Sequence, residues 1–229
     1  MKIHRFFIDI VPDTAETAFT LGAPQVVRQI NSVLKIGLEE RIEVCDGKGR
    51  SAILQIKKIE KNSILAHVLS VSNQTESVRP VTAFVAVLKN DHFALVVQKL
   101  TELGIAEIIP LITARTIKIG CNMSRLTAIA REAAELSGRV TIPKIHEPQP
   151  FKTAAAAVGA QAYFFDVTKE KQRKPKTIPT SFFVGPEGGW SPEEISHAHA
   201  CGLISRQLGP LILRGETAAI VGAYVTINE

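Results

Sequence analysis

The chain has 229 residues, of which 45% are hydrophobic and 21% charged, and its formal net charge is +5 at pH 7. This length allows one large domain or two small ones, and no apolar run approaches the roughly 18 residues of a membrane span. The charged N-terminus lacks the apolar region of a signal peptide, and the three cysteines have neither zinc-site nor disulfide-framework spacing. We therefore expect a soluble cytoplasmic protein with no bound metal and no membrane partner, whose basic charge suits a polyanion.

Residues 1–72 are predicted to be rich in strands. Residues 42–49 and 51–59 indicate two strands joined at the turn signal Asp46-Gly47, and residues 63–71 indicate a third. Residues 23–34 carry apolar side chains at helical spacing. A small β-barrel with one short helix is the architecture that this pattern favours.

Residues 73–79 are polar and are predicted to be a linker, so that residues 73–229 form a second domain. In that domain the pattern predicts strands over residues 81–88, 108–112, 162–165, 182–184 and 204–208, and helices over residues 91–103, 124–136 and 217–227. Ser124 is the predicted cap of the second of these helices. Alternating strands and helices predict a mostly parallel sheet with helices on both faces. Residues 169–176 are predicted to be a mobile loop.

A strand, a glycine turn and a capped helix follow one another from residue 181 to residue 194. The apolar run that ends at Val184 is typical of a buried parallel strand, and the sequence GPEGG that follows allows a ligand to approach bare backbone. Ser191 and Glu194 have the spacing of a capping box, with Pro192 at the first helical position. This arrangement is typical of a ligand loop in an α/β domain, although ordinary turns are also rich in glycine and proline.

A second motif, LGPLILRGETA over residues 208–218, leads into an apolar segment that reaches residue 227. The two motifs together resemble the SPOUT class of RNA methyltransferases. Within this class, they resemble the ribosomal RNA small subunit methyltransferase E family, which methylates N3 of a uridine. Further segments stand in the order typical of this family, at residues 5–7, 33–35, 46–47, 98–104, 110–111 and 132–139. The resemblance therefore covers most of the chain.

The resemblance implies an α/β fold in which a small PUA-like β-barrel, a fold used for RNA, precedes a SPOUT domain with a trefoil knot. The rules of chain connection alone would not predict a knot. Members of this class are usually homodimers with the active site at the subunit interface. The implied partners are 16S ribosomal RNA, within the small ribosomal subunit, and a second copy of the chain.

The implied cofactor is S-adenosylmethionine, which has an adenine, a ribose and a sulfonium but no phosphate. A phosphate-binding glycine loop is therefore not needed, and the sequence contains neither a P-loop nor a G-x-G-x-x-G fingerprint. The cofactor needs an apolar slot and backbone hydrogen-bonding groups. The candidate cofactor-binding residues are Val184, Gly185, Gly188, Gly189, Leu208, Gly209, Leu213 and Thr217. Leu213 also fits a place in the hydrophobic core.

Arg214 and Glu216 are the candidate catalytic residues. A guanidinium would stabilise the negative charge of a uracil that loses its N3 proton, and Glu216 would orient Arg214 or bind the substrate. The alternative is a structural ion pair at the start of a helix. The six histidines form no recognisable acid–base set, and the sequence names no proton acceptor.

Five basic residues are candidates for contacts with RNA, and two of them, Lys99 and Arg139, are candidates for phosphate contacts that position RNA without reading its sequence. They are Arg5, Arg28, Lys35, Lys99 and Arg139. For any single one, a place on the solvated surface is the simpler alternative.

The chain departs from the pattern of the family at two informative positions. Leu211 stands where an arginine is usual, and His92 stands where lysine or arginine is common. These departures leave open a catalytically impaired RNA-binding protein, although Arg214 and Glu216 are retained. An α/β enzyme that uses another nucleotide cofactor is a third alternative, and the missing phosphate-binding loop counts against it.

Overall fold

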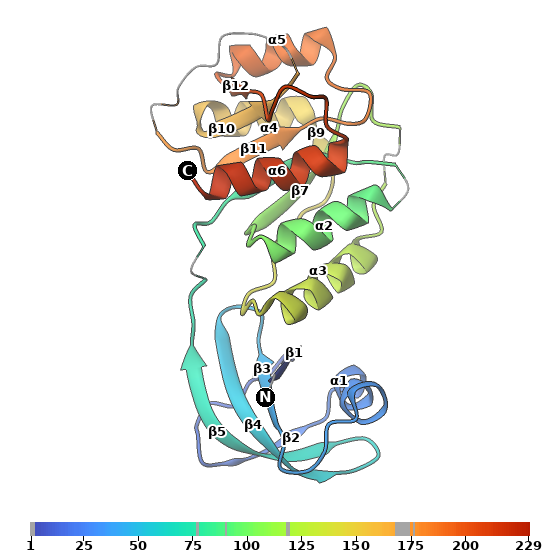
Figure 1. The fold of residues 1–229 in the computed structure, drawn as a ribbon, viewed down its shortest axis with the longest axis vertical. Coiled ribbons are helices and arrows are strands. Elements are labelled where there is room, and N and C mark those ends of the chain that lie inside the picture. The colour runs from blue at the N-terminus through green and yellow to red at the C-terminus, as the bar shows by residue number, and fades with distance from the viewer. Residues whose placement is uncertain (1–2, 77, 90, 118–119, 168–174, 176) are drawn as a thin grey trace. The chain divides into compact units, whose positions relative to one another are not determined.

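The computed structural model describes residues 3–76, 78–89, 91–117, 120–167, 175 and 177–229 (Figure 1). The chain forms two compact units. Unit 1 comprises Met1–Ser77 and Ala134–Ile142, and unit 2 comprises Val78–Ala133 and Pro143–Glu229. Most of the predicted mobile loop, residues 169–176, lies outside the described residues. In the described part of the chain, no helix has the length and apolar character needed to cross a membrane.

Unit 1 is built on a five-stranded sheet. Its order is β1 (His4–Phe7), β3 (Arg41–Cys45), β4 (Arg50–Ile59), β5 (Ile64–Asn73) and β2 (Ala18–Leu21). Strands β1 and β3 are parallel and the other pairs are antiparallel. Closing a barrel requires the two end strands to pair. Among the described residues β1 and β2 do not pair, so the sheet is open and the predicted closed barrel is not found.

The helix of unit 1 covers one face of this sheet. Pro24–Arg28 form α1, and the helix widens into a π-helical segment over Gln29–Leu34 before Lys35, at φ 52°, ends it. The predicted apolar stripe is only partly buried. Val27 and Ile30 join the core with the sheet residues, whereas Val33 is 68% exposed.

The segment Ala134–Ile142 belongs to unit 1 although it is distant in sequence. It contains the end of α3 (Met123–Ser137), where the Glu135 carboxylate accepts a hydrogen bond from the backbone N–H of Phe7 at 3.2 Å. Val140 packs in a small buried cluster with Phe7 and Cys45. Unit 1 is therefore discontinuous in sequence, so a single boundary position along the chain does not separate the two units.

Unit 2 is built on a parallel sheet, as the alternating pattern predicts. Its order is β12 (Ile204–Arg206), β10 (Ala162–Phe165), β11 (Ser181–Val184), β6 (Thr82–Ala86), β7 (Glu107–Ile112) and β8 (Lys144–Ile145), with β9 (Gln149–Pro150) also pairing with β7. Every pair is parallel. Strands β10 and β11 are buried over their whole length, which explains their continuous apolar sequence.

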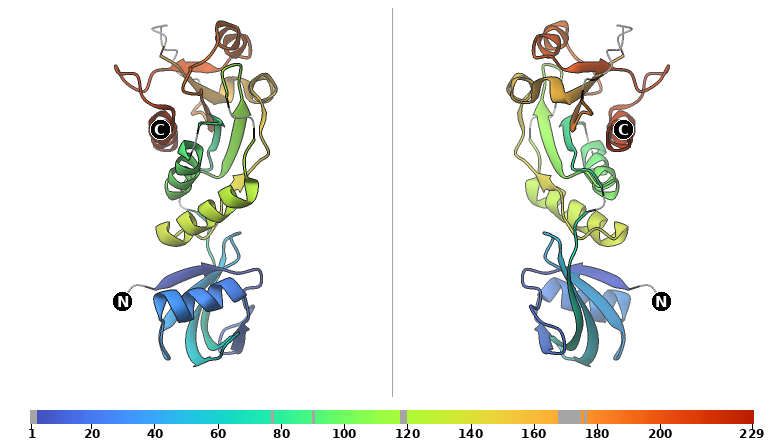
Figure 2. Two further views of the ribbon diagram at one scale, coloured as in Figure 1. Left: turned by 90° about the vertical axis from the view of Figure 1, so that its right-hand side faces the viewer. Right: turned by 90° about the vertical axis from the view of Figure 1, so that its left-hand side faces the viewer.

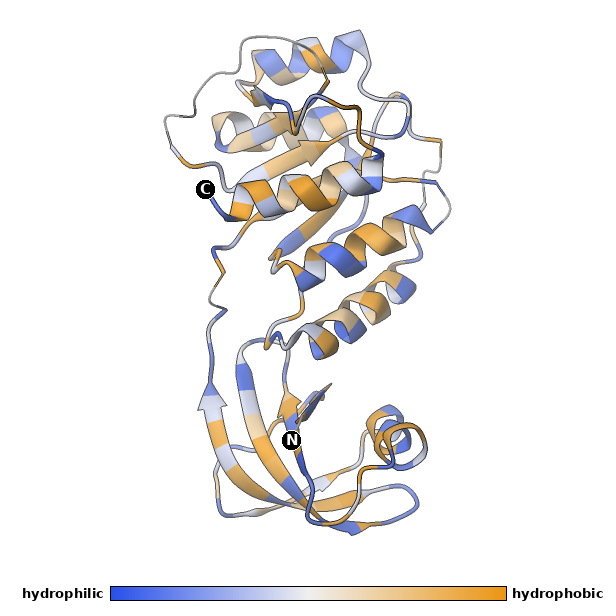
Figure 3. Cartoon of the chain, in the orientation of Figure 1, coloured by the Kyte–Doolittle hydropathy of each residue, from blue (hydrophilic) through white to orange (hydrophobic). Residues whose placement is uncertain are grey.

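Helices cover both faces of the sheet in unit 2 (Figure 2). Helices α4 (Phe151–Val158) and α5 (Pro192–Ala200) pack in an aromatic core with Phe164 and Phe183. Helices α2 (His92–Glu102) and α6 (Gly215–Ile227) lie side by side on the other face. Figure 3 shows that α6 is hydrophobic along most of its length, as its burial against β11 requires.

Two details of the helices differ from the sequence prediction. Helix α3 starts at Met123, and the side chain of Asn122, not Ser124, accepts the N–H of Arg125 at 3.1 Å. Helix α4 was not predicted, because its alanine-rich sequence has no cap signal and begins directly after Pro150. The trefoil knot stays a prediction.

Candidate active site

The candidate site lies where several strands of unit 2 end. All strand pairs in this sheet are parallel, so the carboxyl ends of β10, β11 and β6 meet at one edge, where ligands bind in open α/β sheets. The first motif of the sequence follows β11 directly, and the second lies between β12 and α6. The topology therefore brings both predicted loops to this edge.

The loop after β11 is held in place from three sides. The buried indole of Trp190 donates a hydrogen bond to the backbone oxygen of Phe165 at 3.0 Å. The Glu187 carboxylate accepts the N–H of Lys89 at 2.8 Å, and Arg115 donates to the backbone oxygen of Gly188 at 2.7 Å. These contacts fix the backbone of the loop against β10, the segment after β6 and the segment after β7.

The predicted capping box at the start of α5 is confirmed. The Ser191 hydroxyl accepts the N–H of Glu194 at 3.2 Å, and the Glu194 carboxylate accepts the N–H of Ser191 at 2.9 Å. The second oxygen of the same carboxylate accepts the N–H of Ala114 at 2.8 Å. A single carboxyl group, 4% exposed, thus joins the helix to the segment after β7.

Two glycines of this loop are required by its geometry. Gly189 has φ +69°, a conformation that side chains disfavour, and its N–H closes a turn onto the oxygen of Pro186 at 2.8 Å. A Cβ at Gly185 would come within 3.0 Å of the Trp190 ring. A Cβ at Gly189 would meet no protein atom within 4 Å, so the space above this glycine is open.

Two adjoining clefts open at this edge, with volumes of about 580 Å³ and about 600 Å³. The first is lined by the predicted residues Val184, Gly185, Gly188, Gly189, Leu213, Arg214 and Glu216. The second is lined by Leu208, Gly209 and Leu213. Phe165 and Ile212 line both clefts, which makes them neighbours. Thr217 lines neither cleft and is exposed on α6.

Arg214 and Glu216 occupy different environments at the start of α6. Arg214 is exposed, and no ion pair joins it to Glu216 or to another described residue. Glu216 is 9% exposed, and its Oε2 lies 3.6 Å from Nδ1 of His92, the first residue of α2. The sequence singled out His92 only as a departure from the family pattern. That His92 lies beside Glu216 was not predicted, because α2 and α6 are far apart along the chain.

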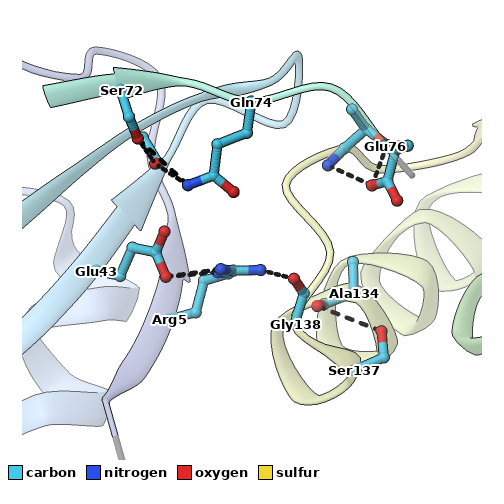
Figure 4. A network of polar contacts seen from close by, with 10 residues as sticks. Arg5, Glu43, Ser72, Gln74, Glu76, Ala134, Ser137 and Gly138 are labelled. Atoms are coloured by element: carbon cyan, nitrogen blue, oxygen red, sulfur yellow. Dashed lines mark hydrogen bonds and ion pairs between the residues drawn. The ribbon is translucent and has the colours of Figure 1, made fainter.

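Two of the predicted RNA contacts are used inside unit 1. The guanidinium of Arg5 pairs with Glu43 at 2.7 Å and donates to the backbone oxygen of Gly138 (Figure 4). Arg139 is 6% exposed and pairs with Glu76 at 3.3 Å. Both guanidinium groups are therefore engaged in contacts within unit 1, and the contact of Arg5 and Arg139 with RNA stays a prediction.

The other three predicted RNA contacts are more accessible. Arg28 and Lys35 are exposed on the helical segment of unit 1. Lys99 is partly buried on α2 and pairs with Glu102 one helical turn later, at 2.8 Å. Arg28 and Lys35 are thus the more accessible of the predicted cations.

Comparison with known proteins gives a consistent result. Residues 75–226 match the model of the RNA methyltransferase domain family. The chain is 28% identical to the ribosomal RNA small subunit methyltransferase E of Rickettsia conorii, over 96% of this chain and 93% of that protein. It is 31% identical to the protein of the same name from Synechocystis, over 93% and 73%.

A solved structure supports the same relationship. The chain resembles the crystal structure of a ribosomal RNA small subunit methyltransferase E from Neisseria gonorrhoeae bound to S-adenosyl methionine, with a TM-score of 0.86 and 26% identity. The match covers 98% of this chain and 96% of that one.

Proposed function

Because the chain belongs to the ribosomal RNA small subunit methyltransferase E family, we propose that it methylates N3 of a uridine in 16S ribosomal RNA, with S-adenosylmethionine as methyl donor. The observation that carries the proposal is the pair of adjoining clefts lined by both loop motifs, with Arg214 and Glu216 on the wall of the first. A substrate base that enters this cleft would meet the donor and these two side chains together.

The clefts fit the proposed donor. Small-molecule sites are typically concave, mostly apolar and roughly 300–1,000 Å³ in volume, with a few backbone groups that fix the orientation of the ligand. Val184 and Leu213 offer apolar surface, and the bare backbone of Gly185 and Gly189 offers hydrogen-bonding groups. These residues would hold the adenosine part. When bound, the donor supplies an electrophilic methyl group.

Arg214 is the residue proposed to stabilise the reacting base. When N3 of uracil loses its proton, negative charge spreads to the two neighbouring carbonyl oxygens. A guanidinium in the cleft offers paired donors to such an oxygen, and Arg214 forms no ion pair with any described residue that would compete. The charge is largest near the transition state, so Arg214 acts on the rate more than on binding.

The proposal includes a homodimer and the knotted topology of the SPOUT class. Leu211, Ile212 and Tyr224 are 77%, 83% and 60% exposed, and the first two lie on the loop that lines the clefts. Contiguous patches of exposed apolar side chains are typical of interfaces, and Leu211 and Ile212 are adjacent on this loop. A second copy of the chain is the proposed partner, and a monomer in light scattering at assay concentration would contradict this part.

The substrate assignment is tested on small-subunit particles from a strain that lacks the corresponding methylation. The wild-type protein should form 3-methyluridine, identified by mass spectrometry of nucleosides, and protein-free 16S RNA serves as the comparison substrate. A different methylated nucleoside would contradict the substrate assignment. Cofactor binding without any methylation would favour the alternative of an impaired RNA-binding protein.

The role of Arg214 is tested by Arg214→Ala in single-turnover reactions at saturating cofactor. Loss of one preorganised donor typically lowers the rate by about a hundred- to a thousandfold. Cofactor affinity, measured by calorimetry, should stay near the wild-type value, and Arg214→Lys should recover only part of the rate because an ammonium lacks the planar pair of donors. A normal rate combined with lost cofactor binding would make Arg214 a binding residue.

A further inference from the structure

Two buried polar atoms face each other on the wall of the first cleft. Nδ1 of His92 and Oε2 of Glu216 lie 3.6 Å apart, and neither has a hydrogen-bond partner among the described residues. Both side chains line the cleft, one from α2 and one from α6, which Figure 1 shows side by side. Leaving a buried polar atom unpaired is typically unfavourable by about 1–3 kcal/mol. A hydrogen bond between Nδ1 of His92 and Oε2 of Glu216 would satisfy both atoms.

The two nitrogens of His92 have different surroundings. Nδ1 is buried toward Glu216, whereas the side chain as a whole is 42% exposed, so the ring is open on the side away from Nδ1. In a neutral imidazole one nitrogen carries the proton and the other is an acceptor. A carboxylate beside Nδ1 favours the tautomer with the proton on Nδ1, which leaves the lone pair on Nε2.

We propose that His92 is the proton acceptor of the methylation, with Glu216 as the positioning residue that holds its tautomer. This inference rests on the proposed function, because uridine N3 carries the proton in question. The N3–H bond breaks and an Nε2–H bond forms, and the electron pair left on N3 forms the bond to the methyl group. The electrons of the former sulfur–methyl bond stay on sulfur, and water later removes the proton from the imidazolium.

The other charged groups near His92 are less suited to this step. Arg214 has no lone pair available to accept a proton. Glu187 accepts the N–H of Lys89, Asp166 accepts the N–H of Val167 at 2.7 Å, and Asp91 is paired with Arg125 at 2.7 Å. His92 therefore brings an open ring nitrogen to the first cleft.

The variant His92→Arg tests the inference directly. An arginine at this position has a cationic group that can pair with Glu216, but it has no acceptor nitrogen. Histidine offers both the pairing and the acceptor. His92→Arg therefore separates the role of a counter-charge from the role of a base.

The first experiment compares single-turnover rates of His92→Ala and His92→Arg on the same small-subunit particles. General acid–base catalysis contributes typically about 10²–10⁴-fold, so we expect both variants to be at least about a hundredfold slower. Added free imidazole should restore part of the rate of His92→Ala but not of His92→Arg. Calorimetry with the cofactor shows that each variant is folded.

A matched control is provided by another histidine–carboxylate pair of unit 2. His146 lies 2.6 Å from Glu107, the first residue of β7, so this pair is at the opposite edge of the sheet from the clefts. His146→Ala should methylate at the wild-type rate. Wild-type activity of His92→Arg would show that His92 is only a counter-charge and would overturn the proposal.

The second experiment reads the pair without methylation. Nitrogen-15 NMR of the imidazole should show the Nδ1–H tautomer for His92 in the wild-type protein and a shift toward the Nε2–H tautomer in Glu216→Leu. An unchanged tautomer would overturn the positioning role of Glu216. If the tautomer shifts but the product is not 3-methyluridine, the proton-acceptor role falls with the proposed function while the orientation of His92 by Glu216 stands.

Discussion

Gly222 is the position at which one added methyl group should disturb unit 2 most clearly. It lies in the middle of α6, and an added Cβ would stand 2.6 Å from Cε2 and 2.9 Å from Cδ2 of Phe165. Real Cβ atoms essentially never approach other heavy atoms to less than 3.0 Å, so the ring or the helix must move. Phe165 is 5% exposed and packs against Phe182, with a ring centroid distance of 5.8 Å.

The magnitude follows from two opposing effects. Overpacking a core typically lowers stability by about 1–3 kcal/mol, and we take the upper end because the clash involves a buried ring and a helix backbone. Alanine is better than glycine within a helix by about 1 kcal/mol. Gly222→Ala should therefore destabilise unit 2 by about 2 kcal/mol. With a typical urea m-value of about 2 kcal/mol/M, this lowers the unfolding midpoint by about 1 M.

The assay is urea unfolding followed by tryptophan fluorescence. Trp190 is the single tryptophan of the chain and is buried in the aromatic core of unit 2, so its signal reports on that unit. Gly209→Ala is the control, since its Cβ would meet nothing within 4 Å and should leave the midpoint unchanged or slightly higher. A midpoint for Gly222→Ala at or above that of the wild type would refute this reasoning.

Three further predictions concern single carboxyl and thiol groups. Burial raises the pKa of the Cys45 thiol to about 12. Alkylation of the native protein should therefore modify the two other, partly exposed cysteines and spare Cys45. Equal modification of all three cysteines, measured by mass spectrometry, would contradict this. Burial acts to raise the pKa of Glu76, but hydrogen bonds from Thr141 and the charge of Arg139 outweigh it and hold the pKa below the ordinary value of 4.5. A carboxyl group with a lowered pKa stabilises the fold at pH values above its unfolded-state pKa, and this stabilisation is lost as the pH falls through its folded-state pKa. Glu76→Gln lacks this stabilisation, so acid unfolding of unit 1, followed by circular dichroism, should begin at higher pH in this variant than in the wild type. Glu194→Ala should destabilise unit 2 by roughly 2–3 kcal/mol because one buried and one part-buried hydrogen bond from a backbone amide lose their acceptor. A change below about 0.5 kcal/mol would disprove the role of this carboxylate.

The sequence was most informative where the signal is local. The parallel sheet of unit 2 was predicted because a continuous apolar run such as Ser181–Val184 needs burial on both faces, and a local pattern records that need. The capping box was predicted for the same reason, since Ser191 and Glu194 interact within a single turn. The family resemblance added what periodicity does not contain, namely a pairing of two loops that are separated along the chain.

The features that were missed depend on contacts between distant segments. An open sheet and a closed barrel have the same strand patterns and differ only in whether β1 and β2 pair. The segment Ala134–Ile142 has no composition that marks it as part of unit 1. The role of Arg139 depends on Glu76, a partner in the predicted linker that no spacing rule connects with it. A positive charge in a sequence predicts an accessible cation only when its partners are known.

The geometry of the candidate site depends on the same close packing that makes α6 sensitive to substitution. A Cβ at Gly215 would stand 2.8 Å from Cδ2 of Leu88, so α6 lies very close to the segment after β6 one residue before Glu216. Leu88 is fully buried, so its side chain or the helix would have to shift to accept a Cβ here. Glycine at this position therefore brings the start of α6 close to the start of α2, and this approach places the carboxylate 3.6 Å from His92. A side chain at Gly215 that moved the helix outward by about an ångström would separate two buried polar atoms that have no other described partner, and each would keep its desolvation penalty of about 1–3 kcal/mol. The glycine thus contributes to the proposed chemistry by allowing the close approach that sets the distance between His92 and Glu216.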